Sequence, residues 1–348
     1  MSHIFSYKLL SARILNAFSQ QKLADKADVS KQMISKYEKG LSMPSSEVLI
    51  KLAKALQVQV DYFFTPQTIE LGALNFRKKS KLSITRLKAI KEEVKNRVSN
   101  YIEIENILQI ETAFKTSVQK RKISSLEDIE KSVLAIRNEW KIGIDPVHNI
   151  IQALEDQEIK VIEIEEEENL FDGMATLIDD KYAVIVVNKN FGIERKRFTL
   201  LHELGHLLLD LPNCDKKEEE KFCNRFAGEF LFPKSSIIRE FGIKRDHISL
   251  KELIEMQKKY GISISAIVYR LKDIGIISEA KQRNFHISLN ANPELKELVY
   301  KERFNTPEFS NRYEQLVYRA FSQELISASK AASLLDNNIN KVLEKVMM

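Results

Sequence analysis

The string His202-Glu203-Leu204-Gly205-His206 constrains this chain more than any other feature of its sequence. Two histidines four residues apart share one face of a helix, so both imidazole rings can bind a single zinc ion. Glu203 lies one step around that helix, where its carboxylate can reach a water on the metal without occupying a coordination position. The sequence therefore predicts a helix that carries two zinc ligands, His202 and His206, and a general base, Glu203.

A second helix is predicted between Glu218 and Pro233, where phenylalanine and alanine form an apolar stripe. A catalytic zinc ion needs three protein ligands and one open position, so we expect the third ligand to come from this helix. Cys214 and Cys223 flank its acidic residues, and either thiolate can bind zinc. A cysteine ligand would be unusual for a peptidase, so we interpret both as small hydrophobic residues.

The two helices together resemble the ImmA/IrrE family of metallopeptidases, through HELGHLLL followed by E-x-x-x-N-R-F-A-x-E-F-L-x-P. The resemblance covers most of the chain and implies a zincin-like fold. It also implies that the third ligand is the glutamate four residues before Asn224, which is Glu220. Glu218 and Glu219 are then interpreted as solvated, and Glu229 as support for the helix pair. Characterised family members cleave a DNA-binding repressor, which implies a repressor-type protein as substrate.

Residues 19–40 are typical of a helix-turn-helix, with two short helices that cross at a steep angle. Ser30 caps the second helix, and Asp28 occupies the turn, because aspartate tolerates left-handed backbone geometry better than most residues. Such a second helix fits the major groove, where polar side chains bond to base edges or phosphates. The residues expected to contact DNA are Gln20, Ser30, Lys31, Gln32, Ser35 and Lys36.

This segment resembles the Xre family of phage-repressor-like DNA-binding domains, in which the position of Asp28 is usually glycine. Fusion of an Xre-type domain to the peptidase is a recurrent arrangement in the ImmA/IrrE family. The residues that match are Ser19-Gln20, Leu23-Ala24, Val29-Ser30, Ile34-Ser35, Glu38, Gly40, Pro44, Leu49, Leu52-Ala53 and Leu56.

The charge distribution favours a nucleic-acid partner for the N-terminal part. Residues 1–100 carry 18 Lys and Arg against 8 Asp and Glu, a net charge of +10, although the whole chain has a net charge of only +5. The rest of the chain is therefore mildly acidic, at −5. A basic segment on an acidic remainder indicates that this segment meets a polyanion, which we take to be double-stranded DNA.

The pattern along the chain predicts a multidomain, mainly α protein. We expect an all-α helix-turn-helix domain over residues 1–66 and a helical linker over 67–140. An α+β peptidase domain with a small sheet is expected over 141–275 and a helical C-terminal region over 276–348. Within the peptidase domain we predict a helix over 146–157, started by Asp145 and Pro146. Strands are expected at 159–164, 174–178 and 182–187, with a hairpin turn at 179–181. The second could align an extended substrate, with Gly173 permitting close approach of the substrate backbone.

Composition excludes several other classes of protein. No apolar run approaches the roughly 20 residues of a membrane span, and the first ten residues lack the features of a signal peptide. Two cysteines without CxxC spacing exclude a disulfide framework. We therefore expect a cytoplasmic protein without a membrane partner. Its oligomeric state is open, with a homodimer as one option.

These features predict a DNA-binding, zinc-dependent endopeptidase that cleaves a transcriptional repressor to control stress-response or mobile-element genes. The competing hypothesis is a transcription regulator or antitoxin whose peptidase-like domain senses zinc or a partner without proteolysis. Glu203 favours the first hypothesis, because a protein that only senses zinc has no need of a carboxylate that is not a ligand.

Overall fold

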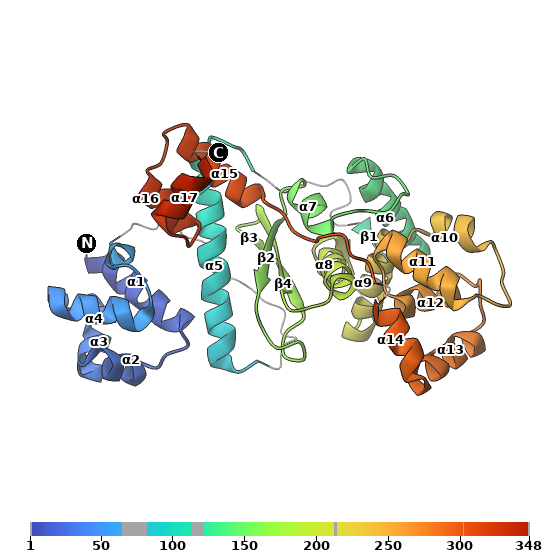
Figure 1. Cartoon of the computed structure of the whole chain (residues 1–348), viewed down its shortest axis with the longest axis horizontal. Helices are drawn as coiled ribbons and strands as arrows, with labels where there is room; N and C mark the ends of the chain where they lie inside the picture. The colour runs from blue at the N-terminus through green and yellow to red at the C-terminus, as the bar shows by residue number, and fades with distance from the viewer. Residues whose placement is uncertain are drawn as a thin grey trace. The chain divides into compact units, whose positions relative to one another are not determined.

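A computed structural model of the chain describes residues 2–64, 82–112, 114, 121–211, 214–301 and 303–346 (Figure 1). The chain divides into two compact units. Unit 1 comprises residues 1–74, 80–111 and 314–348, and unit 2 comprises residues 75–79 and 112–313. Within the described ranges, no helix has both the length and the apolar character needed to cross a bilayer. The predicted domain boundaries stay predictions, and the first of them lies outside the described residues.

Unit 1 is built from helices, as the sequence predicts for the N-terminal domain. Its core joins buried residues of the first four helices, among them Phe5, Leu23, Ile34 and Leu52. The elements are α1 (Ser2–Leu15), α2 (Gln20–Ala27), α3 (Lys31–Glu38), α4 (Ser46–Leu56), the 3₁₀ helix η1 (Val60–Phe63), α5 (Ile84–Ile107), α15 (Arg312–Ser322), α16 (Ala328–Leu334) and α17 (Ile339–Val346), and the first two residues of α15 belong to unit 2.

The helix-turn-helix forms as predicted from α2 and α3. Ser19 and Ser30 cap the two helices, each side-chain oxygen accepting a hydrogen bond from the backbone N–H three residues later. Asp28 ends α2 with a left-handed backbone at φ 56°, which is the role expected of the residue at the turn. The short polar side chain of Asp28 therefore replaces the more usual glycine without altering the turn.

Unit 2 contains a small sheet and nine of the described helices. Its elements are β1 (Arg121–Lys122), α6 (Leu126–Glu139), α7 (Ile150–Glu155), β2 (Lys160–Ile164), β3 (Gly173–Ile178), β4 (Tyr182–Asn188), α8 (Ile193–Leu208), β5 (Leu209–Asp210), α9 (Lys216–Leu231), α10 (Lys234–Phe241), α11 (Leu250–Tyr260), α12 (Ile264–Asp273), α13 (Glu279–Ala291) and α14 (Pro293–Lys301).

The main sheet has the strand order β2-β4-β3, with β2 parallel and β3 antiparallel to β4. Asp179 and Asp180 form the tight turn between β3 and β4 at φ 52° and 53°, so the predicted hairpin is confirmed. The central strand β4 is almost entirely buried, whereas β3 pairs along one side only and forms an edge of the described sheet. A second, two-stranded parallel pair of β1 and β5 was not predicted.

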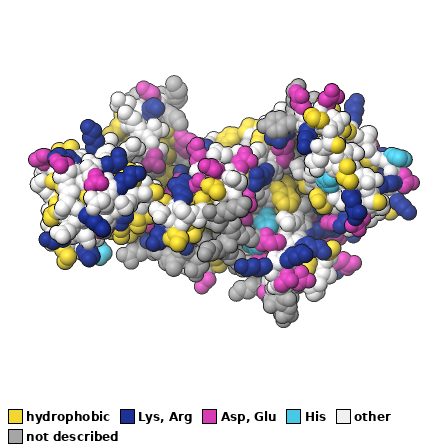
Figure 2. Space-filling model, turned by 90° about the horizontal axis from the view of Figure 1, so that it is seen from below, with side chains coloured by type: hydrophobic (Ala, Val, Ile, Leu, Met, Phe, Trp, Pro, Cys, Tyr) yellow, Lys and Arg dark blue, Asp and Glu magenta, His cyan; other side chains and the backbone are white. Residues whose placement is uncertain are grey.

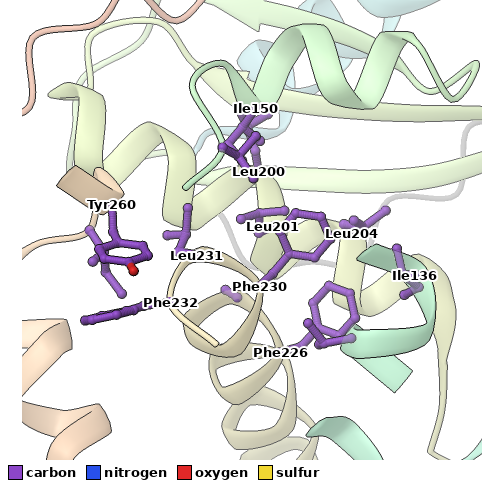
Figure 3. Packing of buried hydrophobic residues seen from close by; sticks show 14 of the residues in the cluster. Ile136, Ile150, Leu200, Leu201, Leu204, Phe226, Phe230, Leu231, Phe232 and Tyr260 are labelled. Carbon is purple, nitrogen blue, oxygen red and sulfur yellow. The ribbon is translucent and has the colours of Figure 1, made fainter. Parts of the chain in front are cut away.

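The core of unit 2 lies where α8 and α9 pack together (Figure 3). Leu200, Leu201 and Leu204 of α8 face Phe226 and Phe230 of α9 in this cluster. Helix α6, which the sequence analysis assigned to a linker, packs against α9 and contributes several residues to the same core. The two helices that carry the predicted metal ligands are therefore held by a large apolar interface.

The helix predicted over residues 146–157 is shorter than expected. The structure begins α7 at Ile150, with Asn149 rather than Asp145 as its N-cap. The backbone carbonyl of Asp145 accepts a hydrogen bond from Arg137, and those of Val147 and His148 accept from Arg197. These carbonyls bind arginine side chains outside the segment instead of backbone N–H groups of a longer α7, so the cap signal of Asp145 and the proline signal of Pro146 do not start the helix here.

Candidate functional site

Three predicted metal ligands lie together between α8 and α9. His202 and His206 come from α8 and Glu220 from α9, and their ligand atoms all lie within 4.8 Å of one another. The two Nε2 atoms are 3.2 Å apart, and the carboxylate oxygens of Glu220 lie 3.4 Å from Nε2 of His202 and 3.5 Å from Nε2 of His206. Tetrahedral zinc with bonds of about 2.0–2.1 Å places its ligand atoms roughly 3.3–3.4 Å apart. The donor set therefore has the spacing that zinc requires.

The other ring nitrogens of both histidines have oxygen partners. Nδ1 of His202 lies 2.9 Å from Oδ1 of Asn224, and Nδ1 of His206 lies 3.0 Å from a carboxylate oxygen of Glu219. In this arrangement each Nδ1 donates its proton, so in its neutral form each ring turns an Nε2 lone pair toward the other. Two facing lone pairs repel, and a cation between them removes that repulsion. The arrangement of hydrogen bonds thus fits a metal ion independently of the distances.

The interpretation of Glu219 as a solvated residue is wrong. Its carboxylate is bonded to His206, and its side chain is only 23% exposed. Sequence spacing gave no sign of this, because Glu219 lies one residue before Glu220 and thirteen residues after His206. Glu229 lies outside the cluster and bonds to Arg270 and to the backbone N–H of Lys234, so it links α9 to α12 and α10.

Glu203 is buried on α8 at 7% exposure and lies beside the first residue of β3. A Cβ atom on Gly173 would lie 3.2 Å from Cγ of Glu203 and 2.8 Å from Cγ2 of Thr199. Gly173 is therefore needed because α8 packs closely on the start of β3. In the direction that a Cβ would take, the neighbours of Gly173 are side chains of α8 and the carbonyl oxygen of Val186, and the predicted approach of a substrate backbone to Gly173 stays a prediction.

Cys223 lies at the crossing of α8 and α9. A Cβ on Gly205 would be 3.3 Å from Cα of Cys223, so the glycine allows the two helices to approach. Cys223 is fully buried, and its sulfur lies 3.4 Å from Nδ1 of His206, on the ring edge away from Glu220. Cys214 is partly exposed, and burial is the main cause that raises the pKa of its thiol.

The start of α8 is held by a buried ion pair that the sequence analysis missed. Arg197 bonds to Glu308 at 2.6 Å and to backbone carbonyls, among them those of Val147 and Gly261. Glu308 in turn accepts the backbone N–H groups of Ile150 and Ile151. Burial lowers the pKa of Arg197, and the negative charge of Glu308 opposes that shift. No local pattern indicates a pair that is separated by 111 residues.

The residues predicted to contact DNA fall into two groups. Ser30, Lys31, Gln32 and Lys36 are exposed on or just before α3, and Ser35 is half-buried. Gln20 instead donates a hydrogen bond of 2.7 Å to Glu38, which also binds Arg13. This network joins α1, α2 and α3, so the Nε2 group of Gln20 has a structural partner.

Comparisons with known proteins agree with this two-part organisation. Residues 9–63 match a helix-turn-helix family, and residues 154–272 match the IrrE N-terminal-like domain family. An uncharacterized HTH-type transcriptional regulator from Rickettsia conorii is 40% identical over 57 residues, which are 16% of this chain and 46% of that protein. Radiation response metalloprotease IrrE from Deinococcus radiodurans is 32% identical over 108 residues, which are 27% of this chain and 32% of that protein.

The chain thus spans less than half the length of the curated relatives that it matches. A crystal structure of Bacillus thuringiensis PlcR aligns over 99% of the chain and 97% of that protein. The identity is 14% and the TM-score is 0.18, a value too low to indicate a shared fold.

Proposed function

We propose that this chain, which combines a helix-turn-helix domain with an IrrE-like metallopeptidase-family domain, is a zinc-dependent endopeptidase that binds double-stranded DNA and cleaves a repressor-type protein. The observation that carries the proposal is the cluster of His202, His206 and Glu220, with the two histidines oriented by Asn224 and Glu219. A catalytic zinc site has three protein ligands and an open position, which is the number of ligands gathered here.

The residues of the site have separate roles in peptide hydrolysis: three of them bind the metal, and Glu203 transfers protons. Zinc, when bound by His202, His206 and Glu220, supplies a Lewis acid that polarises a carbonyl and lowers the pKa of water. The carboxylate of Glu203 accepts a proton from the attacking water and then donates it to the leaving amine. Glu203 is buried beside Gly173 and Thr199, and this burial restricts the movement of its side chain.

An edge strand beside the general base gives the substrate a place to lie. Strand β3 pairs only with β4 in the described sheet, and its first residue, Gly173, lies beside Glu203. The unpaired side of such a strand can hydrogen-bond an extended peptide by strand addition. We propose that β3 aligns the substrate in this way, which suits an endopeptidase that binds chain on both sides of the cleaved bond.

The DNA-binding part of the proposal rests on α3 and the charge of the N-terminal residues. Exposed Lys31, Gln32 and Lys36 offer donors to phosphates and base edges. DNA binding would place the peptidase close to repressors that are bound at their operators. Control of stress-response or mobile-element genes by repressor cleavage follows from that placement, and the radiation-response name of one relative is compatible with it.

The test of the peptidase proposal is Glu203→Gln. Because Glu203 is not a metal ligand, the variant should retain about one zinc per chain and wild-type DNA binding, whereas His202→Ala and His206→Ala should lose the metal. Cleavage of the repressor should fall by at least about 10²–10⁴-fold, the usual contribution of a general acid–base group.

The measurements are metal content, repressor cleavage and target-gene expression in cells under the inducing condition. If Glu203→Gln still switches the target genes on fully, proteolysis is not the output. The competing hypothesis, a transcription regulator or antitoxin that senses zinc or a partner without proteolysis, would then replace the proposed peptidase function.

A further inference from the structure

A pocket of about 760 Å³ opens next to the candidate metal centre, between α9 and α12. Glu220 and Asn224, which belong to that centre, also line this pocket. Its volume lies in the range of pockets that hold a drug-sized ligand, so it can take a short peptide segment rather than one side chain. On the face drawn in Figure 2, a histidine side chain lies in a recess beside hydrophobic side chains, and both acidic and basic side chains lie around it.

Two helix faces form the walls. On α9, Lys217, Lys221 and Asn224 follow one another at helical spacing along the wall. On α12, Ala266 and Tyr269 do the same, and Tyr269 is 53% exposed.

Apolar side chains from other elements add to these walls. Leu126 and Phe198 come from α6 and α8 and pack against the main core. The pocket therefore offers apolar surface together with a basic rim.

Two arginines that line the pocket also hold its two helices together. A Cβ on Gly228 would lie 2.8 Å from Cδ of Arg270, so this glycine admits the arginine stem. Arg270 is bonded to buried Glu229, and Arg225 lies 3.1 Å from Asp273 and 2.8 Å from Glu130. These two arginines are neutralised within unit 2 and hold α9 against α12.

The hydrogen bonds that Glu130 receives are strong enough to reverse the effect of its burial. Burial by itself would raise the pKa of Glu130, but the bonds from Arg225 and Lys234 lower it. Glu130 therefore pairs with Arg225 and Lys234, and it does not neutralise the lysines at the rim of the pocket.

Lys217 and Lys221 differ from the arginines. Both are exposed, and neither forms an ion pair with a carboxylate in the part of the chain that the structure describes. The acidic residues nearest to them in sequence have other partners: Glu218 bonds to the backbone of Asp215 at the helix cap, Glu219 bonds to His206, and Glu220 lies against His202 and His206. Two ammonium groups at the mouth of an apolar pocket attract an anion.

We propose that this pocket is a substrate subsite that binds an acidic peptide segment next to the cleaved bond. An apolar side chain of that segment packs against Phe198 and Ala266, and a neighbouring Asp or Glu lies near Lys217 and Lys221. The inference rests on the proposed peptidase function and names its substrate class, a protein with an apolar–acidic sequence at the cleavage site.

The binding test uses the full-length, zinc-loaded Glu203→Gln protein, so that peptide is not consumed. The probes are a labelled octapeptide with adjacent Leu and Glu in an Ala–Gly background and its Leu–Lys counterpart, compared by fluorescence anisotropy. The acidic peptide should bind about five- to tenfold more tightly, since two exposed ion pairs each contribute modestly. Lys217→Glu/Lys221→Glu should remove or reverse that preference.

The matched control is Lys216→Glu/Lys251→Glu, which changes the net charge equally but involves residues outside the pocket lining. This control should keep the preference for the acidic peptide. Equal affinity for the two peptides, or a preference that survives Lys217→Glu/Lys221→Glu, would overturn the inference.

Cleavage-site profiling of the wild-type protein on a mixed peptide library separates this inference from the proposed function. Enrichment of Asp or Glu next to an apolar residue supports both. Cleavage without such enrichment would overturn the proposed subsite but would still support the proposed peptidase function. Absence of any cleavage, together with lysine-dependent binding of the acidic peptide, would show a pocket that binds acidic peptides, but it would overturn both the peptidase and the role of this pocket as a substrate subsite.

Discussion

At the scale of single residues, the two histidines owe their orientation to partners outside the HExxH string. Asn224 and Glu219 accept hydrogen bonds from the Nδ1 groups of His202 and His206, which fixes the tautomers with Nε2 turned toward Glu220. A ring that is free to rotate or to exchange its proton would bind a metal less well, because the lone pair would face the ligand position only part of the time.

Glu219→Gln tests this orienting role. The amide keeps the size of the side chain but weakens the bond to Nδ1 of His206, so zinc affinity should fall by about 10–100-fold. Competition with a chelator of known affinity measures the change. Glu218→Gln is the control, because Glu218 bonds only to the helix cap among described contacts, and its zinc affinity should equal that of wild type. Equal affinities for both variants would contradict the role of Glu219.

Gly173→Ala tests the close contact between α8 and β3. The added Cβ would lie 2.8 Å from Cγ2 of Thr199 and 3.0 Å from the backbone carbonyl oxygen of Val186, so unit 2 should lose about 1–3 kcal/mol. Trp140, the one tryptophan of the chain, is buried in the core of unit 2, and its fluorescence follows unfolding in denaturant. Adding Thr199→Ser should restore part of the loss, and no change on Gly173→Ala would contradict the contact.

At the scale of secondary-structure elements, α3 is short and depends on tertiary contacts as well as on its cap. It has eight residues, begins at the Ser30 cap and buries only Ile34 and Tyr37. The ion pair of Arg13 with Glu38 joins its last residue to α1. Helices of this length are marginal alone, so packing on α1 and α2 holds the exposed face of α3 in place.

Lys36→Ala tests whether that face binds DNA. In the full chain, loss of one phosphate contact should weaken binding to a labelled duplex and reduce the slope of log K against log salt by about 1. Anisotropy titrations at several salt concentrations measure both effects. Lys251→Ala, an exposed lysine on α11 of unit 2, removes the same charge and should leave the slope unchanged. A slope that falls equally in both variants would indicate a non-specific charge effect.

At the scale of the whole molecule, segment 303–311 ties the start of α8 to a distant part of the chain. Glu308 binds Arg197 and the N-terminal backbone of α7, and the backbone N–H of Phe304 donates to Glu194 of α8. The helix that carries His202 and His206 is thus held at its start by residues about one hundred positions later in the sequence. A buried pair of this kind is costly to break, because one charge is then left unpaired.

Glu308→Gln should destabilise unit 2 by about 3–5 kcal/mol, since both side chains of the pair are at most 1% exposed. Glu158→Gln is the matched control: its pair with Arg312 is partly exposed at 28% and 18%, so less than about 1 kcal/mol is expected. Denaturant unfolding followed by Trp140 fluorescence gives both values. Comparable small losses in the two variants would show that the buried pair does not hold the unit together.

The sequence by itself determined the features that depend on neighbours along the chain. The helix-turn-helix, the hairpin turn at 179–181 and the helix with histidines at i and i+4 follow from caps, turns and helical periodicity, which act over a few residues. The choice of Glu220 needed a family resemblance in addition, because spacing alone left several acidic residues open.

Only the tertiary structure decided which side chains support these elements. The bond from His206 to Glu219, the fit of Gly173 under α8 and the pair of Arg197 with Glu308 join residues that are 13, 26 and 111 positions apart. The early start predicted for α7 failed for the same reason, since Arg137 and Arg197 bind the carbonyls that a longer helix would use. Burial makes such contacts obligatory, because a buried polar group must find a partner wherever the fold supplies one, and no local pattern specifies where that is.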